Sequence, residues 1–352
     1  MASGGPQETA GAKGAKGGFR AVFAAFGANL GIAAVKLIAF TLTGSASMLA
    51  EFVHSLADSG DQVLLLVGRN RAARAQTEEH PFGFGRERYF YAFLVAVVLF
   101  TVGAVVSFYD GIHKMLHPEP VTDAYVAFGV LAAAACLEGF SMRTGVIESN
   151  RVRGALSWGA FIRQAKAPEL PVVLLEDTAG LLGLACAFTG VGLTVVTHDG
   201  VWDGAGSIGV GAVLACVAAI LATEMKSLLI GESASADIER RIVTALAGSP
   251  DVQRVIHLRT MHLGPESLLV AAKIAVRGDE PAGRLARGID AAERRVRAAV
   301  PIAEVIYLEP DVYQETKVHL AHPAIRAVHR SWRGRHGHGS QCGSQGQHPR
   351  AG

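Results

Sequence analysis

The sequence predicts an all-α bundle of six membrane-spanning helices, followed by a small cytoplasmic α/β domain with the metallochaperone-like order αββαβ. Half of the 352 residues are hydrophobic, only 18% are charged, and mean hydropathy is +0.30. A soluble chain carries about a quarter charged residues. The apolar residues lie mostly before residue 231, and charged sequence follows. This pattern excludes a disordered chain and a disulfide-stapled secreted domain, and the net charge of +2 does not indicate a nucleic-acid partner.

The membrane spans follow from the length of the apolar stretches. A helix needs about 20 apolar residues to cross about 30 Å of hydrocarbon. Residues 89–109 and 204–223 meet this requirement without a charge. Four further stretches are apolar but carry polar residues, namely 19–43, 45–67, 123–142 and 170–195. We therefore expect a six-span domain over 19–230, preceded by a disordered arm over 1–18.

Loop charges predict the orientation of these spans. Fourteen lysines and arginines fall in the N-terminal arm, in the loops after spans 2 and 4, and directly after span 6, whereas Lys114 alone lies on the other side. Because positive loops stay in the cytoplasm, both termini are predicted to be cytoplasmic. Residues 1–18 lack the apolar core of a cleavable signal. We expect an integral protein of the bacterial inner (plasma) membrane.

The chain after residue 231 predicts a small domain over 236–312. Alternating and helical spacings predict, in order, a helix over 238–247, strands over 252–261 and 267–276, a helix over 281–300 and a strand over 303–308. Residues 313–352 are polar, Gly-rich and His-rich, and this composition is typical of a disordered tail.

Span 2 carries a stripe of polar residues that should be costly in a membrane. Ser47, Glu51, His54, Asp58 and Asp61 fall three or four residues apart, which places them on one helical face. Ionisable groups cost at least about 2.5–3.5 kcal/mol each at the centre of a spanning helix. The stripe therefore indicates that this face of span 2 lines a water-filled pathway. The alternative is that the helix simply packs against polar partners.

His54 and Asp58 are one helical turn apart and can meet one divalent ion from the same face. A nitrogen and a carboxylate oxygen suit zinc or a similar first-row ion. Span 5 runs in the opposite direction and carries Glu176 and Asp177 inside apolar sequence. A rise of about 1.5 Å per residue brings Asp177 to a depth similar to that of Asp58, so we predict a metal site of His54, Asp58 and Asp177.

The remaining intramembrane polar residues allow ligand, relay or structural roles. Glu176 points about 100° away from Asp177, so it is a further ligand, a proton relay or a salt-bridge partner of Lys36. Glu51 and Asp61 are further candidates for ligand or relay. Asn29 and Lys36 share a face of span 1; they line the route or tie helices together, and the structural role is the preferred interpretation. Glu138 is expected near the inner end of span 4, where its side chain can extend to the interface.

Specific motifs make this sequence similar to the cation diffusion facilitators, a family of zinc-transporter-like efflux proteins. They are Gly-Ser-Ala-Ser-Met-Leu-Ala-Glu-Phe-Val-His-Ser-Leu-Ala-Asp-Ser over 44–59, His-Pro-Phe-Gly-Phe-Gly-Arg-Glu over 80–87, and Asp177 on span 5. The resemblance covers about residues 19–312. It implies a homodimer, not an enzyme, that exports Zn²⁺ or a related divalent cation in exchange for protons. Two ligands each from spans 2 and 5 would form its tetrahedral site.

One position departs from the family pattern. The ligand that many relatives place four residues before Asp177 is Val173 here. The resemblance then implies three protein ligands plus water, or recruitment of Glu176, and it admits Mn²⁺, Fe²⁺, Co²⁺ or Ni²⁺. Leu-Leu-Glu-Asp on span 5 resembles the branch of mitochondrial zinc-transporter-like proteins, so Zn²⁺ is the first expectation. In the cytoplasmic domain, His257 and His262 are weak candidates for a further site.

Metal binding needs a neutral imidazole and ionised carboxylates, so it competes with protons. Protonation on the outer side would release the ion, and alternating access would come from rocking of the helices that carry the site. A membrane-embedded metalloenzyme, a channel and a metal sensor are the alternatives. The spans contain no HExxH or GxSxG element, and the chain lacks the repeated carboxylate or carbonyl rings of a channel.

Overall fold

The computed structural model describes residues 6–43, 46–118 and 124–312. The chain divides into two compact units. The first runs to Glu232 and includes the turn His262–Leu268; the second holds the rest of the chain from Ser233. The change of unit therefore falls where the composition changes. The tail over 313–352 and the start of the N-terminal arm lie outside the described residues.

Most of the first unit is helical. Its elements are α1 (Pro6–Thr43), α2 (Ala46–Ala72), α3 (Glu87–Val98), the π-helical η1 (Leu99–Val105), α4 (Val106–Leu116), α5 (Ala124–Arg153), α6 (Trp158–Gln164), α7 (Glu169–Thr197) and α8 (Val201–Ile230). The third predicted span is the continuous run α3–η1–α4. The helix α1 begins at Pro6, so the expectation of disorder up to residue 18 is wrong from Pro6 onward. The alanines and lysines of that stretch favour helix, whereas its glycines do not.

Within the described residues, five helices are long and apolar enough to cross a membrane: α1, α3–η1–α4, α5, α7 and α8. The helix α2 has 27 residues and matches the predicted second span, but it does not meet the hydropathy criterion. The reason is its polar stripe with Glu51, Asp58 and Asp61. Hydropathy alone would miss this span, because the polar residues on the face that packs against other helices lower its mean hydropathy.

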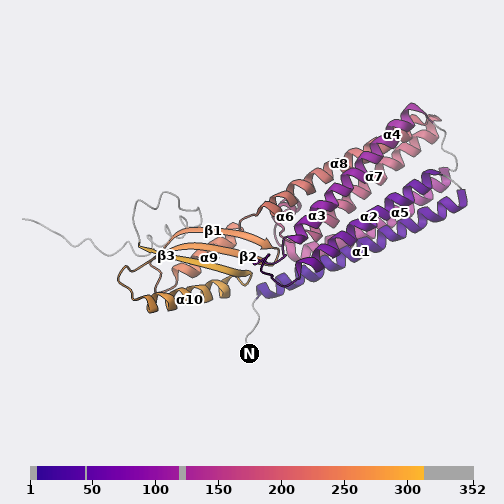
Figure 1. Ribbon diagram of the computed structural model, residues 1–352. Helices are drawn as coiled ribbons and strands as arrows, with labels where there is room; N and C mark the ends of the chain where they lie inside the picture. The colour runs from indigo at the N-terminus through magenta and orange to yellow at the C-terminus, as the bar shows by residue number, and fades with distance from the viewer. Residues whose placement is uncertain (1–5, 44–45, 119–123, 313–352) are drawn as a thin grey trace, which may run out of the picture. The chain divides into compact units, whose positions relative to one another are not determined.

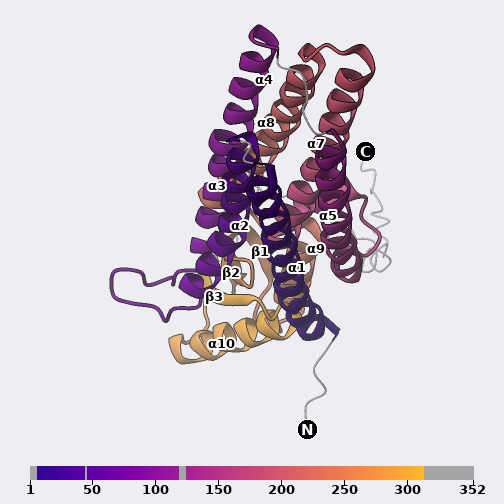
Figure 2. The same ribbon diagram turned by 90° about the vertical axis from the view of Figure 1, so that its right-hand side faces the viewer.

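The helices pack in two neighbouring groups. In the first group, α1 lies against α2, α5 and α7, and α5 also packs on α7, as the parallel course of α1, α2 and α5 in Figure 1 shows. In the second group, α3, η1 and α4 lie along α8. The two groups meet where α8 packs on α7 and α3 packs on α2. Figure 2 shows α8 between α4 and α7.

Glycines let α8 approach both of its neighbours. A Cβ on Gly190 of α7 would lie 2.8 Å from the Trp202 carbonyl oxygen and 3.1 Å from Gly206 Cα. On the other side of α8, a Cβ on Gly204 would lie 2.8 Å from the Gly111 carbonyl oxygen on α4. Small residues at such crossings let helix backbones come close in a membrane. Close packing thus fixes α8 between α7 and α4.

Gly190→Val is expected to destabilise the bundle by about 1–3 kcal/mol, as overpacking of a tight contact does. The matched control is Gly192→Val two residues further along α7, where a Cβ meets nothing within 4 Å. Thermal unfolding of both variants in the same detergent checks this prediction. Equal midpoints for the two variants would contradict the close crossing of α7 and α8.

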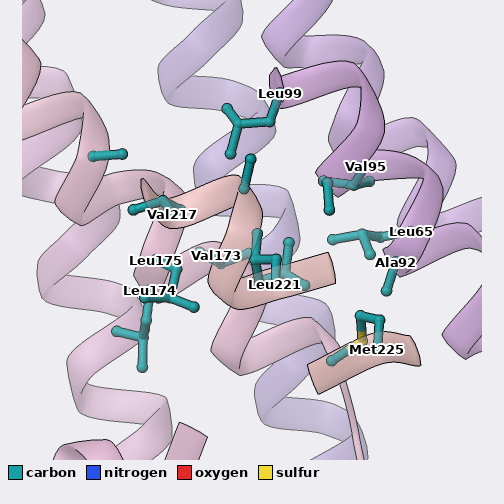
Figure 3. Close-up of a cluster of buried hydrophobic side chains, with 14 of the residues drawn as sticks. Leu65, Ala92, Val95, Leu99, Val173, Leu174, Leu175, Val217, Leu221 and Met225 are labelled. Atoms are coloured by element: carbon teal, nitrogen blue, oxygen red, sulfur yellow. The ribbon is translucent and has the colours of Figure 1, made fainter. Parts of the chain in front are cut away.

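An apolar cluster joins α2, α3, α7 and α8 (Figure 3). Val173 and Leu174 of α7 lie in this cluster with Leu221 and Met225 of α8, and Val95 of α3 is fully buried there. Leu56 of α2, by contrast, is 48% exposed, as expected for the lipid-facing side of that helix. The stretch of α8 that carries Leu221 and Met225 therefore packs in an apolar surrounding.

The second unit has the predicted order αββαβ. Its elements are α9 (Ala236–Ala247), β1 (Arg254–Gly264), β2 (Ser267–Val276), α10 (Ala282–Ala299) and β3 (Ala303–Val312). The strands form one sheet in the order β1-β2-β3, and α9 packs on α10. The Ser235 side chain caps α9 by accepting a hydrogen bond from the Ile238 N–H, which fixes where this helix begins.

His262 on β1 is 2% exposed, and burial lowers its pKa to about 4. An unfolded chain titrates its histidine near pH 6.5, so it binds the proton first as the pH falls. The stability that neutral His262 contributes to the folded protein is therefore fully present above about pH 6.5 and is lost as the pH falls towards 4. Between pH 7 and pH 5 the loss should be about 2 kcal/mol. The unfolding midpoint of His262→Gln should fall less on acidification than that of the parent; parallel curves would contradict the prediction.

Candidate functional site

Asp177 lies in the interior of the bundle on α7. Its side chain is 4% exposed, and the Ser141 hydroxyl of α5 lies 2.9 Å from each of its carboxylate oxygens. One turn along α5, a Cβ on Gly145 would lie 3.8 Å from Asp177 Oδ2 and 3.3 Å from the Leu174 side chain. A serine and a glycine on one face of α5 thus leave room for the carboxylate and orient it. Sequence reasoning missed Ser141, whose signal was a hydroxyl within the apolar span 4.

The polar stripe of α2 turns inward in its described part. Asp61 is 2% exposed and Gln62 is 1% exposed. Gln62 Nε2 donates a hydrogen bond to Glu176 Oε2 of α7 at 2.9 Å, and Asn29 Nδ2 of α1 donates to Gln62 Oε1 at 3.2 Å. This chain of hydrogen bonds links three helices. Gln62 was not among the predicted residues, and Asn29 links α1 to α2 through it.

Two buried carboxylate oxygens are left without a hydrogen bond. Asp61 Oδ1 and Glu176 Oε1 have no partner within the described part of the chain. Buried polar atoms are normally paired, so unpaired ones in a membrane helix mark a place for a cation or a proton. Glu176 takes Gln62 as its partner, whereas Lys36 donates to Ser55, so the expected salt bridge between Glu176 and Lys36 is wrong. Lys36 reaches α2 instead of α7.

Glu138 is another inward-facing carboxyl group. It lies near the middle of α5, and a Cβ on Gly180 of α7 would come within 3.0 Å of its carboxyl carbon and 3.2 Å of both oxygens. The expectation that Glu138 extends to the membrane interface is therefore wrong. The absence of a side chain at Gly180 is what lets this carboxylate lie against α7, three residues beyond Asp177.

The carboxyl groups of α2, α5 and α7 lie within electrostatic range of one another. Asp58, Asp61 and Asp177 act on Glu176, and Asp58 and Asp177 act on Glu138. The structure thus brings together four of the predicted residues, which are Asp58, Asp61, Glu176 and Asp177. In the part of the chain that the structure describes, no three His, Cys, Asp or Glu side chains form a closed group able to hold a metal ion.

The other predicted ligands have separate outcomes. The side chains of Glu51 and His54 lie outside the described residues, although α2 carries both positions. Val173 is fully buried in the apolar cluster with α8, so this position adds no ligand. His257 is partly exposed and His262 is buried, because an odd spacing puts residues on opposite faces of a strand. The structure therefore does not bring His257 and His262 together.

A bundle of membrane-length helices with buried carboxylates contributed by three of them defines a membrane protein that handles cations. Residues 22–230 match the family model of the cation efflux transmembrane domain. The chain belongs to the cation efflux family, as the motifs in spans 2 and 5 indicated, and this family consists of transporters rather than enzymes.

Curated relatives agree with this assignment. The chain is 36% identical over 242 residues to the proton-coupled zinc antiporter SLC30A9, mitochondrial, of Xenopus laevis, an alignment that covers 68% of this chain and 43% of the relative. It is 34% identical over 231 residues to the protein of that name from Homo sapiens, covering 65% and 41%. Metal tolerance protein C4 of Arabidopsis thaliana is 26% identical over 261 residues, covering 74% and 57%. The chain thus spans about two fifths of the length of the SLC30A9 proteins.

Proposed function

We propose that the chain exports a divalent cation, Zn²⁺ first, from the side that carries the arginine-rich loops, in exchange for protons. The observation that carries the proposal is the group of carboxyls from α2, α5 and α7 inside a bundle of membrane-length helices. The names of the relatives, a proton-coupled zinc antiporter and a metal tolerance protein, support the choice of substrate and counter-ion.

The proposed ion site consists of His54 and Asp58 of α2 and Asp177 of α7. One imidazole nitrogen and two carboxylate oxygens suit zinc and also Mn²⁺, Fe²⁺, Co²⁺ or Ni²⁺. With Val173 buried in the apolar cluster, water or a neighbouring carboxyl such as Glu176 completes the coordination. Ser141 holds Asp177 by its hydroxyl, as outer partners of metal ligands do.

Proton exchange follows from the same ligands. Protons and the metal ion compete for the imidazole and the carboxylates, so an acidic outer compartment releases the ion and returns protons inward. Asp61 and Glu176, each with an unpaired carboxylate oxygen, are proposed as proton carriers beside the ion site. Alternating access is proposed to come from rocking of the helices that carry the site relative to the rest of the bundle.

The assembly and location are part of the proposal. Family resemblance favours a homodimer, and the loop charges favour both termini on the cytoplasmic side of a bacterial plasma membrane. The two SLC30A9 relatives are mitochondrial proteins by name.

Transport by the full chain in proteoliposomes tests the proposal. Zinc entry through chains that present the arginine-rich side outward should saturate, should accelerate when the vesicle lumen is acidic, and should fall when the gradient is reversed. Co²⁺, Mn²⁺, Fe²⁺ and Ni²⁺ assayed in parallel identify the preferred ion. If none of these ions moves, cation export is contradicted; if ions move regardless of the pH gradient, proton exchange is contradicted.

A further inference from the structure

Two exposed histidines lie one helical turn apart at the end of α4. The His117 N–H donates a hydrogen bond of 2.9 Å to the His113 carbonyl oxygen, so the helical turn between them is complete. The centres of the two imidazole rings are 5.1 Å apart, and the ring planes make an angle of 32°. Both residues are exposed. The two rings therefore leave the same face of the helix side by side.

This separation of the rings is the one that a shared zinc ion requires. Zinc binds an imidazole nitrogen at about 2.0–2.1 Å, and the ring centre lies about 1.1 Å beyond that nitrogen, or about 3.2 Å from the ion. Two such rings at a tetrahedral angle of about 109° have their centres about 5.2 Å apart. The observed 5.1 Å between His113 and His117 matches this value, so the backbone of α4 already has the geometry that binding requires.

The pair lies beyond the apolar part of its span. The run α3–η1–α4 has 30 residues, or about 45 Å at about 1.5 Å per residue, whereas the hydrocarbon core is about 30 Å thick. The first charge after the apolar stretch 89–109 is Asp110, and both histidines follow it. They lie at the end of the span opposite to the arginine-rich loops, where hydrated ions can reach them.

The local charge at this end of α4 favours a cation. Lys114 Nζ lies 2.9 Å from Asp110 Oδ2 and 3.1 Å from Asp203 Oδ2 of α8. Two carboxylates thus surround one ammonium group and leave one negative charge in excess. A divalent ion that approaches His113 and His117 is therefore attracted rather than repelled.

A role in stabilising the helix explains only part of this pattern. Positive side chains near the C-terminal end of a helix interact favourably with its dipole, and Lys114 already supplies such a charge. Two protonated imidazoles one turn apart would repel each other. The dipole therefore accounts for one histidine, whereas a shared cation accounts for the pair and for its ring spacing.

We propose that His113 and His117 form a binding site for a first-row divalent cation such as Zn²⁺, on the side of the membrane to which the proposed export delivers the ion. Imidazole suits these ions, and water fills the other coordination positions. With two protein ligands the ion exchanges readily with the solution. Asp177 lies about 20 residues before the end of α7, or about 30 Å along the helix, so this site is separate from the proposed intramembrane site and does not depend on transport.

The test measures the protection of individual histidines by zinc chloride in the full-length protein in detergent. Diethyl pyrocarbonate modifies accessible imidazoles, and mass spectrometry of the resulting peptides follows His113, His117 and His198 separately as zinc is added. His198 follows the last residue of α7 and is exposed. It serves as the internal control.

In the parent protein, zinc should protect His113 and His117 with one shared midpoint, while His198 stays reactive at that concentration. His117→Asn should raise the zinc concentration that protects His113 by at least about tenfold, because the loss of even a residue that only hydrogen-bonds to a metal ligand costs about 10–100-fold. His113→Asn should have the same effect on His117. The midpoint should be unchanged in His198→Asn, the matched control, and in Asp177→Asn.

Protection of His113 at the parent midpoint in His117→Asn would overturn the inference, as would an equal midpoint for His198. A lower unfolding temperature of both pair variants without a change in the zinc midpoint would show a helix-stabilising role instead, and would also overturn it. Failure of the proposed function gives a different result, in which the parent protein moves no divalent cation but zinc still protects the pair.

Discussion

Asp177→Asn is expected to reduce zinc transport by at least about 100-fold. The substitution removes a charged ligand, and loss of even a residue that only hydrogen-bonds to a metal ligand lowers metal affinity or activity by about 10–100-fold. The substitution preserves the size of the side chain and leaves an amide oxygen that can still accept from the Ser141 hydroxyl. Folding should therefore be retained, and the loss should fall on ion binding. Asp58→Asn should have a similar effect.

The control for this prediction is Asp237→Asn on the exposed first turn of α9, where the side chain is 67% exposed. This variant should transport zinc at the parent rate. Ser141→Ala keeps the ligand but removes its partner, so it should lose about 10–100-fold. If Asp177→Asn retained most of the parent activity in proteoliposomes, Asp177 would not be a ligand of the transported ion.

Arg88→Met is expected to cost about 3–5 kcal/mol of stability, because it leaves the Glu169 carboxylate buried without its ion-pair partner. Glu169→Leu should cost less, because Arg88 Nη1 also lies 3.7 Å from Glu266 Oε1. Arg88 at the start of α3 is 8% exposed and Glu169 at the start of α7 is 5% exposed. Arg88 Nε and Nη2 lie 2.7 Å and 2.6 Å from Glu169 Oε1. The pair fixes α3 to α7, one helix from each of the two packed groups.

A double-mutant cycle separates the pair from its two members. Arg88→Met should lower the unfolding midpoint strongly and Glu169→Leu should lower it less, since Arg88 keeps Glu266 as a partner. The double variant should recover most of the loss of Arg88→Met, since an apolar pair replaces a buried ion pair at little net cost. The control Arg240→Met breaks an exposed pair with Asp237 and should change stability by less than about 1 kcal/mol. Additive losses in the double variant would contradict the coupling of the two residues.

Most of the fold could be predicted from periodicity and charge. The six long helices and the order αββαβ follow from apolar length, from loop arginines and from alternation in the strands. The start of α1 could not, because Gly- and Ala-rich sequence is compatible with both helix and disorder. The π-helical segment Leu99–Val105 was also missed, since an extra residue in one turn leaves the apolar pattern of span 3 almost unchanged.

The site could be predicted only in part. Asp58, Asp61, Glu176 and Asp177 stood out because ionisable residues are rare in apolar sequence. Arg88 was counted only as a loop charge, since nothing in the sequence shows that Glu169 lies opposite it. Glu138 was placed at the membrane interface because the ends of a span are uncertain by about a turn. Which carboxylate meets Gly180 or Gln62 depends on helix rotation, and only the packed structure shows it.

The central claim is that α2 and α7 bind one divalent ion together through His54, Asp58 and Asp177. An anomalous difference map of the zinc-loaded, full-length protein, collected at the zinc absorption edge, tests this claim most directly. We expect a peak between α2 and α7 with ligand distances of about 2.0–2.2 Å to an imidazole nitrogen and to carboxylate oxygens. The same peak should be absent in Asp177→Asn. Zinc peaks only at other histidines, or a peak between α2 and α7 that persists in Asp177→Asn, would contradict the account.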